Sequence, residues 1–265
     1  NIAWNTVAAV CCGICLSFTY SVIWGILPDT ANYGEWKTGI RATGFIYAIG
    51  VFALICPVVA ANGPSVLLPL LKVILVAYAA YVAHMVLTYS LAVKGFAGLS
   101  PLRFFRAMSE PMLFAFSSAS SVGTLPFNMD ATQQLGARKE VSSFVLPLGA
   151  TINMDGTSIM QGVAVVFAAQ AFGIHLSPMD YVTVIGTATL ASVGTAGVPS
   201  VGLVTLTMVF NSVGLPVEAI GLIMGIDRIL DMTRTAVNIT GDAVCTTIVA
   251  HQNGALDKKV FNETA

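Results

Sequence analysis

Residues 227–242 read DRILDMTRTAVNITGD, and this polar stretch constrains the fold more than any other part of the chain. Its principal polar side chains are spaced 4, 3, 4 and 4 residues apart, so at 3.6 residues per turn they share one face of a helix. These side chains are Asp227, Asp231, Arg234, Asn238 and Asp242. The sequence around them is strongly apolar, so this face must be satisfied by polar partners inside the protein or by bound ions and ligands.

The composition is that of an integral membrane protein. Of 265 residues, 56% are hydrophobic and 9% are charged, whereas soluble domains carry about 25% charged residues. Several uncharged runs reach the roughly 20 residues that cross a bilayer. They are residues 1–28, 42–71, 73–93, 111–129, 156–179 and 181–217. An all-α, multi-pass membrane protein is therefore predicted, with the lipid bilayer as its surroundings. The net charge of −1 argues against a nucleic-acid partner.

Basic residues set the predicted topology. They cluster at 94–106, 138–139 and 258–259, and the positive-inside rule places all three clusters on the cytoplasmic side. Residues 107–137 would then leave the cytoplasm and return, although they are too short for two spans of about 20 residues. A re-entrant helical hairpin is predicted there, because such backbone is tolerated against protein or water. The alternative is one ordinary span with residues 138–139 outside.

The second half of the chain repeats this pattern from the opposite face. Residues 138–175 are predicted to form a span broken at NMDGT (153–157), where Gly156 lets the helix unwind. Residues 181–212 form a second hairpin, and residues 219–252 form the final span. The sequence SVGT at 121–124 recurs at 192–195. A chance match is the alternative, but an inverted repeat would place a transporter's binding site at its broken helices.

Charged groups in the final span point to function, because an acid or arginine at the bilayer centre costs about 2.5–3.5 kcal/mol. A self-neutralising ladder built on Asp231 and Arg234 is the alternative, and with Asp227 and Asp242 it leaves a net charge of −2. Bound cations and a charged substrate would supply that deficit. Carboxylates and freed carbonyls favour Na⁺ over a transition metal. The serines at 117–121 suit a substrate carboxylate.

An enzyme is not predicted. A serine hydrolase would need a GxSxG motif, which does not occur in the sequence. It would also need a histidine near the polar motifs. His84, His175 and His251 all lie outside these motifs in the sequence.

At these motifs the chain resembles the dicarboxylate/amino acid:cation symporters, the glutamate transporter family, over residues 51–255. The matching landmarks are SSASSVGTLP (117–126), NMDGT (153–157), ASVGTAGVP (191–199) and the stretch 227–242. The resemblance implies an elevator-type symporter that couples glutamate or aspartate to Na⁺. It also implies a bacterial inner membrane location and the homotrimer typical of the family. The inverted-repeat transport domain would contain both re-entrant hairpins.

The resemblance further implies ligands, position by position. Arg234 would hold the side-chain carboxylate of the substrate, and Asp231 its α-ammonium group. The implied substrate contacts are Ser120, Ser121, Thr157, Val198, Gly202, Asp231, Arg234, Thr235 and Asn238. One sodium site would be formed by Gly149, Asn153, Asn238 and Asp242. A second would be formed by the carbonyls of Thr151, Ser192, Val193 and Thr195 beside Met154, and a third by Asn153 and Asp155.

The chain departs from the family in two places. Positions where some members carry an additional arginine are Ala119 and Met232, and Arg228 lies one helical turn before Met232. The family's spans before residue 51 are expected to be absent, so residues 51–106 would hold a scaffold remnant and the first transport-domain spans. Residues 1–50 form a membrane segment and loop instead. There WGILPDTANYGEWKTGIRA (24–42) resembles the sugar:cation symporters related to the melibiose carrier.

These departures leave several functions open. The chain is expected to be a fusion joined near Gly50, and the third sodium site would lose a wall with the missing spans. The leading prediction is an acidic amino acid symporter. The alternatives are a symporter for a C4-dicarboxylate or a neutral amino acid, a transport-dead fusion, and a sugar:cation symporter.

Overall fold

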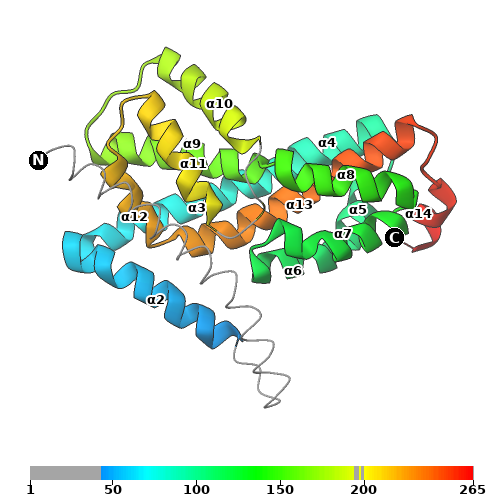
Figure 1. The fold of residues 1–265 in the computed structure, drawn as a ribbon, viewed down its shortest axis with the longest axis horizontal. Helices are drawn as coiled ribbons and strands as arrows, with labels where there is room; N and C mark the ends of the chain where they lie inside the picture. The colour runs from blue at the N-terminus through cyan, green and yellow to red at the C-terminus, as the bar shows by residue number, and fades with distance from the viewer. Residues whose placement is uncertain (1–42, 194–196, 198–199, 265) are drawn as a thin grey trace, which may run out of the picture.

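The computed structural model describes residues 43–193, 197 and 200–264. All regular elements among these residues are helices, which confirms the all-α prediction for this part of the chain. The segment that resembles a sugar symporter, residues 24–42, lies outside the described residues. In Figure 1 the helices form an elongated body in which α13, the final long helix, runs through the middle.

The first described elements make up the most apolar part of the protein. They are α2 (Thr43–Asn62), η1 (Pro64–Val66), α3 (Leu67–Ala83), η2 (His84–Tyr89), α4 (Ser90–Ala92) and η3 (Val93–Ala97). From η1 to η3 the helix is continuous over Pro64–Ala97. In the described part of the chain, this is the one helix long and apolar enough to cross a membrane. Val51–Asn62 and Val201–Ser212 are shorter apolar helices.

Two short helices then pack against each other after α5 (Pro101–Ala107). These are α6 (Ser109–Ser118) and α7 (Ser121–Gln134), and we call them the first helix pair. The turn between them is made by Ala119, whose backbone is left-handed at φ 53°, and by Ser120. The Ser120 hydroxyl oxygen accepts the Gly123 N–H at 3.0 Å, which caps α7.

A broken helix follows, with arms α8 (Lys139–Ile152) and α9 (Asp155–Ala171). The second helix pair is α10 (Pro178–Ser192) and α11 (Val201–Ser212), which also pack together. A capping box begins α10: the Ser177 N–H donates to Asp180 at 2.7 Å, and the Asp180 N–H donates to the Ser177 hydroxyl. Hydrogen bonds from the backbone and the side chain of Ser177 to its carboxylate hold the pKa of the exposed Asp180 below its usual range.

The chain ends with a second broken element. It consists of η4 (Val217–Ala219), α12 (Ile220–Met224), α13 (Asp227–Gln252) and the short α14 (Lys258–Thr264). Helix α13 packs against α3, both arms of the first broken helix and both members of the first helix pair. It is buried on nearly all sides, so the polar face expected from its periodicity lies inside the protein.

The break predicted within NMDGT exists, but Gly156 does not create it. The two non-helical residues are Asn153 and Met154, and Gly156 already belongs to the first turn of α9. Glycine is needed at 156 for a different reason. A Cβ there would lie 2.6 Å from the carbonyl oxygen of Arg234, so only glycine lets α9 approach α13 this closely.

Gly156→Ala is therefore expected to destabilise the protein by about 1–3 kcal/mol, because a backbone carbonyl cannot move aside as a side chain can. Thermal unfolding in detergent would measure the loss. Gly162→Ala on the same helix is the matched control, since a Cβ at 162 meets nothing within 4 Å. The control should be neutral or gain up to about 1 kcal/mol from helix propensity. Equal effects of the two variants would contradict the close approach at 156.

Candidate functional site

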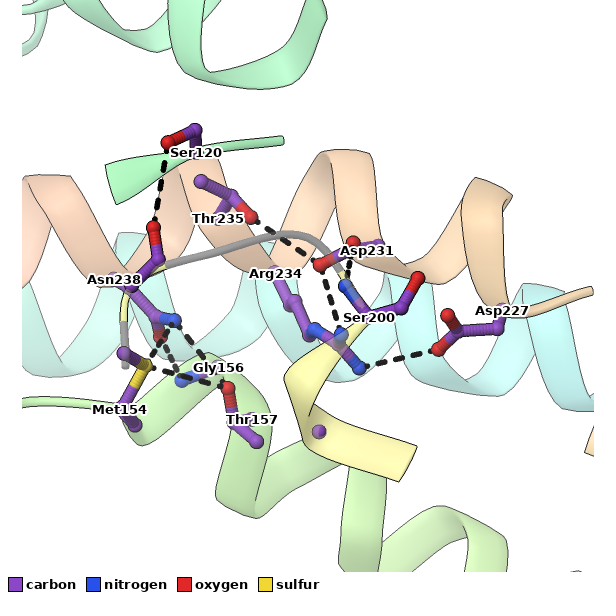
Figure 2. A network of polar contacts seen from close by, with 12 residues as sticks. Ser120, Met154, Gly156, Thr157, Ser200, Asp227, Asp231, Arg234, Thr235 and Asn238 are labelled. Carbon is purple, nitrogen blue, oxygen red and sulfur yellow. Dashed lines mark hydrogen bonds and ion pairs between the residues drawn. The ribbon is translucent and has the colours of Figure 1, made fainter. Parts of the chain in front are cut away.

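The candidate site lies where the turns of the two helix pairs approach the first half of α13 (Figure 2). At its centre the Arg234 guanidinium contacts Asp231 at 2.8 Å and Asp227 at 3.4 Å. All three side chains are buried. The ion-pair ladder considered from the sequence therefore forms, and with Asp242 its face carries the expected charge of −2. Arg228 is also fully buried, so α13 carries three buried aspartates against two buried arginines, a net charge of −1.

Asp231 connects the second helix pair to this centre. Its carboxylate accepts the backbone N–H of Ser200 at 2.7 Å and the Thr235 hydroxyl at 3.4 Å (Figure 2). Ser200 has a left-handed backbone at φ 61°. Among the described residues, Ala119 and Ser200 are the two non-glycine residues with positive φ, and each stands at the turn of a helix pair. Strained backbone of this kind is concentrated at functional sites.

Asn238, on α13, contacts the broken helix around its break and the start of α9. Its side-chain nitrogen lies 3.2 Å from the Met154 sulfur and 3.4 Å from the Thr157 hydroxyl oxygen. Its side-chain oxygen accepts the Gly156 N–H at 2.8 Å. Figure 2 shows these contacts beside the arginine and its two aspartates. The non-helical backbone at 153–154 thus brings the start of α9 against the polar face of α13.

The turns of the two helix pairs meet above this network. The Ser120 hydroxyl donates to the Gly197 carbonyl at 3.3 Å, and the Val122 N–H donates to the same oxygen. Beneath them is a cavity of about 10 Å³, enough for roughly one water molecule. Its lining is Ala119, Ser121, Met154, Thr157, Gly197, Val201, Asp231, Arg234, Thr235 and Asn238. A ligand much larger than a water molecule does not fit this cavity.

This lining brings together most of the substrate contacts implied by the resemblance. Gly202 packs directly on Arg234, since a Cβ there would lie 2.5 Å from a guanidinium nitrogen. Ser120 stands behind the lining, where its hydroxyl joins the two turns. Val198 lies outside the described residues.

The residues of the first implied sodium site also converge. The Asn153 side-chain nitrogen donates to the Asn238 carbonyl at 3.1 Å and to Asp242 Oδ1 at 2.9 Å. Gly149 lies against the same carboxylate, because a Cβ at 149 would be 2.5 Å from Asp242 Oδ1. Asp242 is 1% exposed, and its Oδ2 has no hydrogen-bond partner. A buried, unsatisfied carboxylate oxygen among carbonyls suits a hard cation such as Na⁺.

Asp155, implied in the third sodium site, has partners that sequence reasoning missed. Its carboxylate accepts the Tyr89 hydroxyl and lies 2.9 Å from His84 Nε2. His84 lies outside the polar motifs in the sequence, but the helix that carries it packs beside α9 and α13 and so brings it to Asp155. The signal that could have found His84 is its position as an ionisable residue within the apolar helix Pro64–Ala97, since such residues are usually functional.

The second implied sodium site would use backbone carbonyls and stays a prediction, and the side chains of its residues make other contacts. The Thr151 hydroxyl donates to Leu148 and the Ser192 hydroxyl to Thr189, both within their own helices. Val193 is exposed, and Thr195 lies outside the described residues. Met154 is buried and contacts Asn238 and Thr157 through its sulfur.

Comparison with known proteins extends over the same part of the chain. The family model of the sodium:dicarboxylate symporters matches residues 42–252. The proton/glutamate-aspartate symporter of Escherichia coli K12 is 38% identical over 215 residues, which cover 80% of this chain and 48% of that protein. The human excitatory amino acid transporter 2 is 47% identical over 153 residues, covering 57% of this chain and 27% of that protein.

A third relative is the proton/sodium-glutamate symport protein of Bacillus caldotenax, 36% identical over 210 residues, or 79% of this chain and 50% of that protein. The chain thus spans half or less of the length of these relatives. The described helices that build the site fall inside the matched region. The chain belongs to the sodium:dicarboxylate symporter family, a family of membrane transporters.

Proposed function

We propose that this chain carries the substrate- and ion-binding part of a sodium-coupled symporter for acidic amino acids, glutamate or aspartate. The observation that carries the proposal is the buried Arg234, held between Asp227 and Asp231 at a cavity where the turns of both helix pairs meet. A guanidinium suits a side-chain carboxylate, and a neighbouring carboxylate suits an α-ammonium group. An amino acid with an acidic side chain presents both groups at once.

This substrate explains the charges better than the alternatives do. A plain C4-dicarboxylate would leave Asp231 without an ammonium partner, and a neutral amino acid would leave Arg234 without an external carboxylate. The names of the relatives from Escherichia coli and Bacillus caldotenax both include glutamate. The name of the Escherichia coli protein also includes a proton, and that of the Bacillus caldotenax protein includes both a proton and sodium. Sodium is the ion proposed here, because Asp242 and nearby carbonyls form a buried oxygen-rich site.

Binding would proceed by exchange of ion pairs. In the closed arrangement Asp231 is bound by Arg234 and by the Ser200 N–H. A substrate carboxylate would replace Asp231 on Arg234, and the substrate ammonium would then pair with the released Asp231. The turn that contains Ser200 must move away first, so the second helix pair is proposed to act as the extracellular gate.

The proposed setting follows the inverted-repeat, elevator architecture of the resemblance. Residues 107–137 and 181–212 are proposed as re-entrant hairpins in a multi-pass protein of the bacterial inner membrane, with a homotrimer as the working assembly. The parallel between the halves supports this proposal. Each helix pair turns at a residue of positive φ, and each is followed by an interrupted helix that reaches the site.

Titration calorimetry of L-aspartate into the detergent-purified chain tests the proposal, with NaCl compared with KCl at equal ionic strength. Binding is expected in sodium alone. Repeating the sodium titration at pH 6 and 8 separates coupling to protons from coupling to sodium. Two matched ligands serve as controls: L-serine lacks the side-chain carboxylate, and succinate lacks the ammonium group. Tighter binding of either one, or no binding by folded protein, would overturn the proposed substrate.

A further inference from the structure

Arg228 is the one buried charged residue on α13 that has no role in the proposed function. Its side chain is 0% exposed, and its Nη2 donates to the backbone carbonyl of Ser117 at 3.1 Å. Ser117 belongs to the last turn of α6, immediately before the turn of the first helix pair. The two residues are 111 positions apart, so this contact joins the start of α13 to the first helix pair across the fold.

The position of Arg228 is unfavourable within its own helix. It lies in the first turn of α13, where the macrodipole disfavours a cation. An arginine cannot shed its charge when buried. The end of α6 offers compensation, since the last carbonyls of a helix lack intrahelical partners and carry partial negative charge. Asp227, the adjacent residue, adds a full negative charge.

The carbonyl that Arg228 holds lies close to proposed substrate contacts. Directly after it, the Ser118 hydroxyl oxygen accepts the Ser120 N–H at 3.3 Å. Ala119 has the left-handed backbone, and Ser121 lines the cavity. A shift of the last turn of α6 would therefore be transmitted to Ser121 within four residues.

We propose that Arg228 is a positioning residue that caps α6 and fixes the turn of the first helix pair against α13. It would thereby set the distance between Ser121 and the Asp231–Arg234 pair. Arg228 acts through Ser117 and makes no contact with substrate in this role. Its consequence for binding rests on the proposed function, whereas its effect on the turn does not.

Hydrogen exchange tests the effect on the turn without any substrate. In Arg228→Met, a change that keeps much of the side-chain volume, the hydrogen-bonded amides of Ala119, Gly123 and Thr124 should exchange about tenfold faster. Arg228→Lys retains the charge and one donor and should restore part of the protection. Arg234→Met is the matched control, another buried arginine of α13, whose ion pairs lie within that helix.

The outcomes separate positioning from a general structural role. Unchanged exchange at the turn in Arg228→Met would overturn the proposal. Faster exchange confined to residues 119–124 in Arg234→Met as well would overturn it too, because the loss of either buried arginine would then suffice. Should Arg228→Met fail to fold, Arg228→Lys decides alone. Faster exchange confined to residues 119–124 supports capping, and wild-type exchange there contradicts it.

Aspartate binding in sodium supplies the second readout. Arg228→Met should raise the dissociation constant about tenfold and Arg228→Lys about threefold, since the lysine keeps the charge but not the planar fork. A wild-type chain that binds no aspartate would defeat the proposed function, while the exchange experiment would still decide the role of Arg228. If the wild-type chain binds aspartate and Arg228→Met binds it with the same affinity, the turn of the first helix pair does not need the arginine to be positioned for binding.

Discussion

Arg234→Cys is expected to abolish measurable aspartate binding while the chain remains able to bind sodium. Arg234 is the buried guanidinium that lines the cavity, and it already holds two carboxylates. Truncating one partner of a buried charge pair costs about 2–5 kcal/mol, so the dissociation constant should rise at least about 30-fold. Calorimetric titration of L-aspartate in sodium measures this change directly.

Arg234→Cys also distinguishes a site for acidic amino acids from a site for neutral ones. With Arg234 removed, Asp231 can still pair with an ammonium group, so L-serine should lose far less affinity than L-aspartate. Arg106→Cys is the control, since Arg106 is exposed at the end of α5 and is not among the residues that line the cavity. Aspartate affinity kept in Arg234→Cys would assign the substrate carboxylate to another cation, and Arg228 would be the nearest candidate on the helix.

Removal of Arg234 also leaves Asp227 and Asp231 without their shared cation. Two buried, unpaired carboxylates destabilise a fold by several kcal/mol. Each titration therefore needs a melting curve of the same preparation. Arg234→Lys separates the two effects, because it keeps a positive charge for the aspartates but loses bidentate recognition. We expect this variant to fold like the wild type and to bind aspartate more weakly.

The sequence predicted the chemistry of α13 well, because helical periodicity is a local property. The ion pair between Asp231 and Arg234 follows from their i,i+3 spacing alone. Arg228 escaped this reasoning since it lies about 100° around the helix from Asp227. It is buried because α6 covers that side of α13. A helix buried on nearly every side has no single polar face for periodicity to reveal.

Contacts between distant segments were the other limit. His84 and Tyr89 lie 71 and 66 residues from Asp155, and Ser200 lies 31 residues from Asp231. Spacing in the sequence cannot pair them, because these contacts form only where the helix over Pro64–Ala97 packs beside α9 and α13 and where the start of α11 meets α13. Gly156 illustrates a related limit: its sequence context indicated a special role, but a close approach of two helices and an unwound backbone give the same signal.

Asp242→Asn is expected to remove the response of the protein to sodium. A ligand that binds the folded state alone stabilises it by about 2.7 kcal/mol at a hundred times its dissociation constant. Sodium should therefore raise the melting temperature of the wild-type chain, with potassium at equal ionic strength as the reference. In Asp242→Asn this rise should vanish, because the unsatisfied carboxylate oxygen that suits the cation becomes an amide.

The sign of the effect in potassium makes this test sharper. Without sodium, the wild type retains a buried carboxylate whose Oδ2 has no hydrogen-bond partner, which is costly in a dry interior. Asparagine removes the charge, and its oxygen can still accept the bond that Asn153 donates to Asp242 Oδ1. Asp242→Asn should thus melt at or above the wild-type temperature in potassium and below it in sodium. Asp130→Asn, at an exposed position on α7, should keep the wild-type response in both salts. A sodium shift that survives in Asp242→Asn would move the ion to a different set of oxygens, and Asp155 would be the next carboxylate to replace.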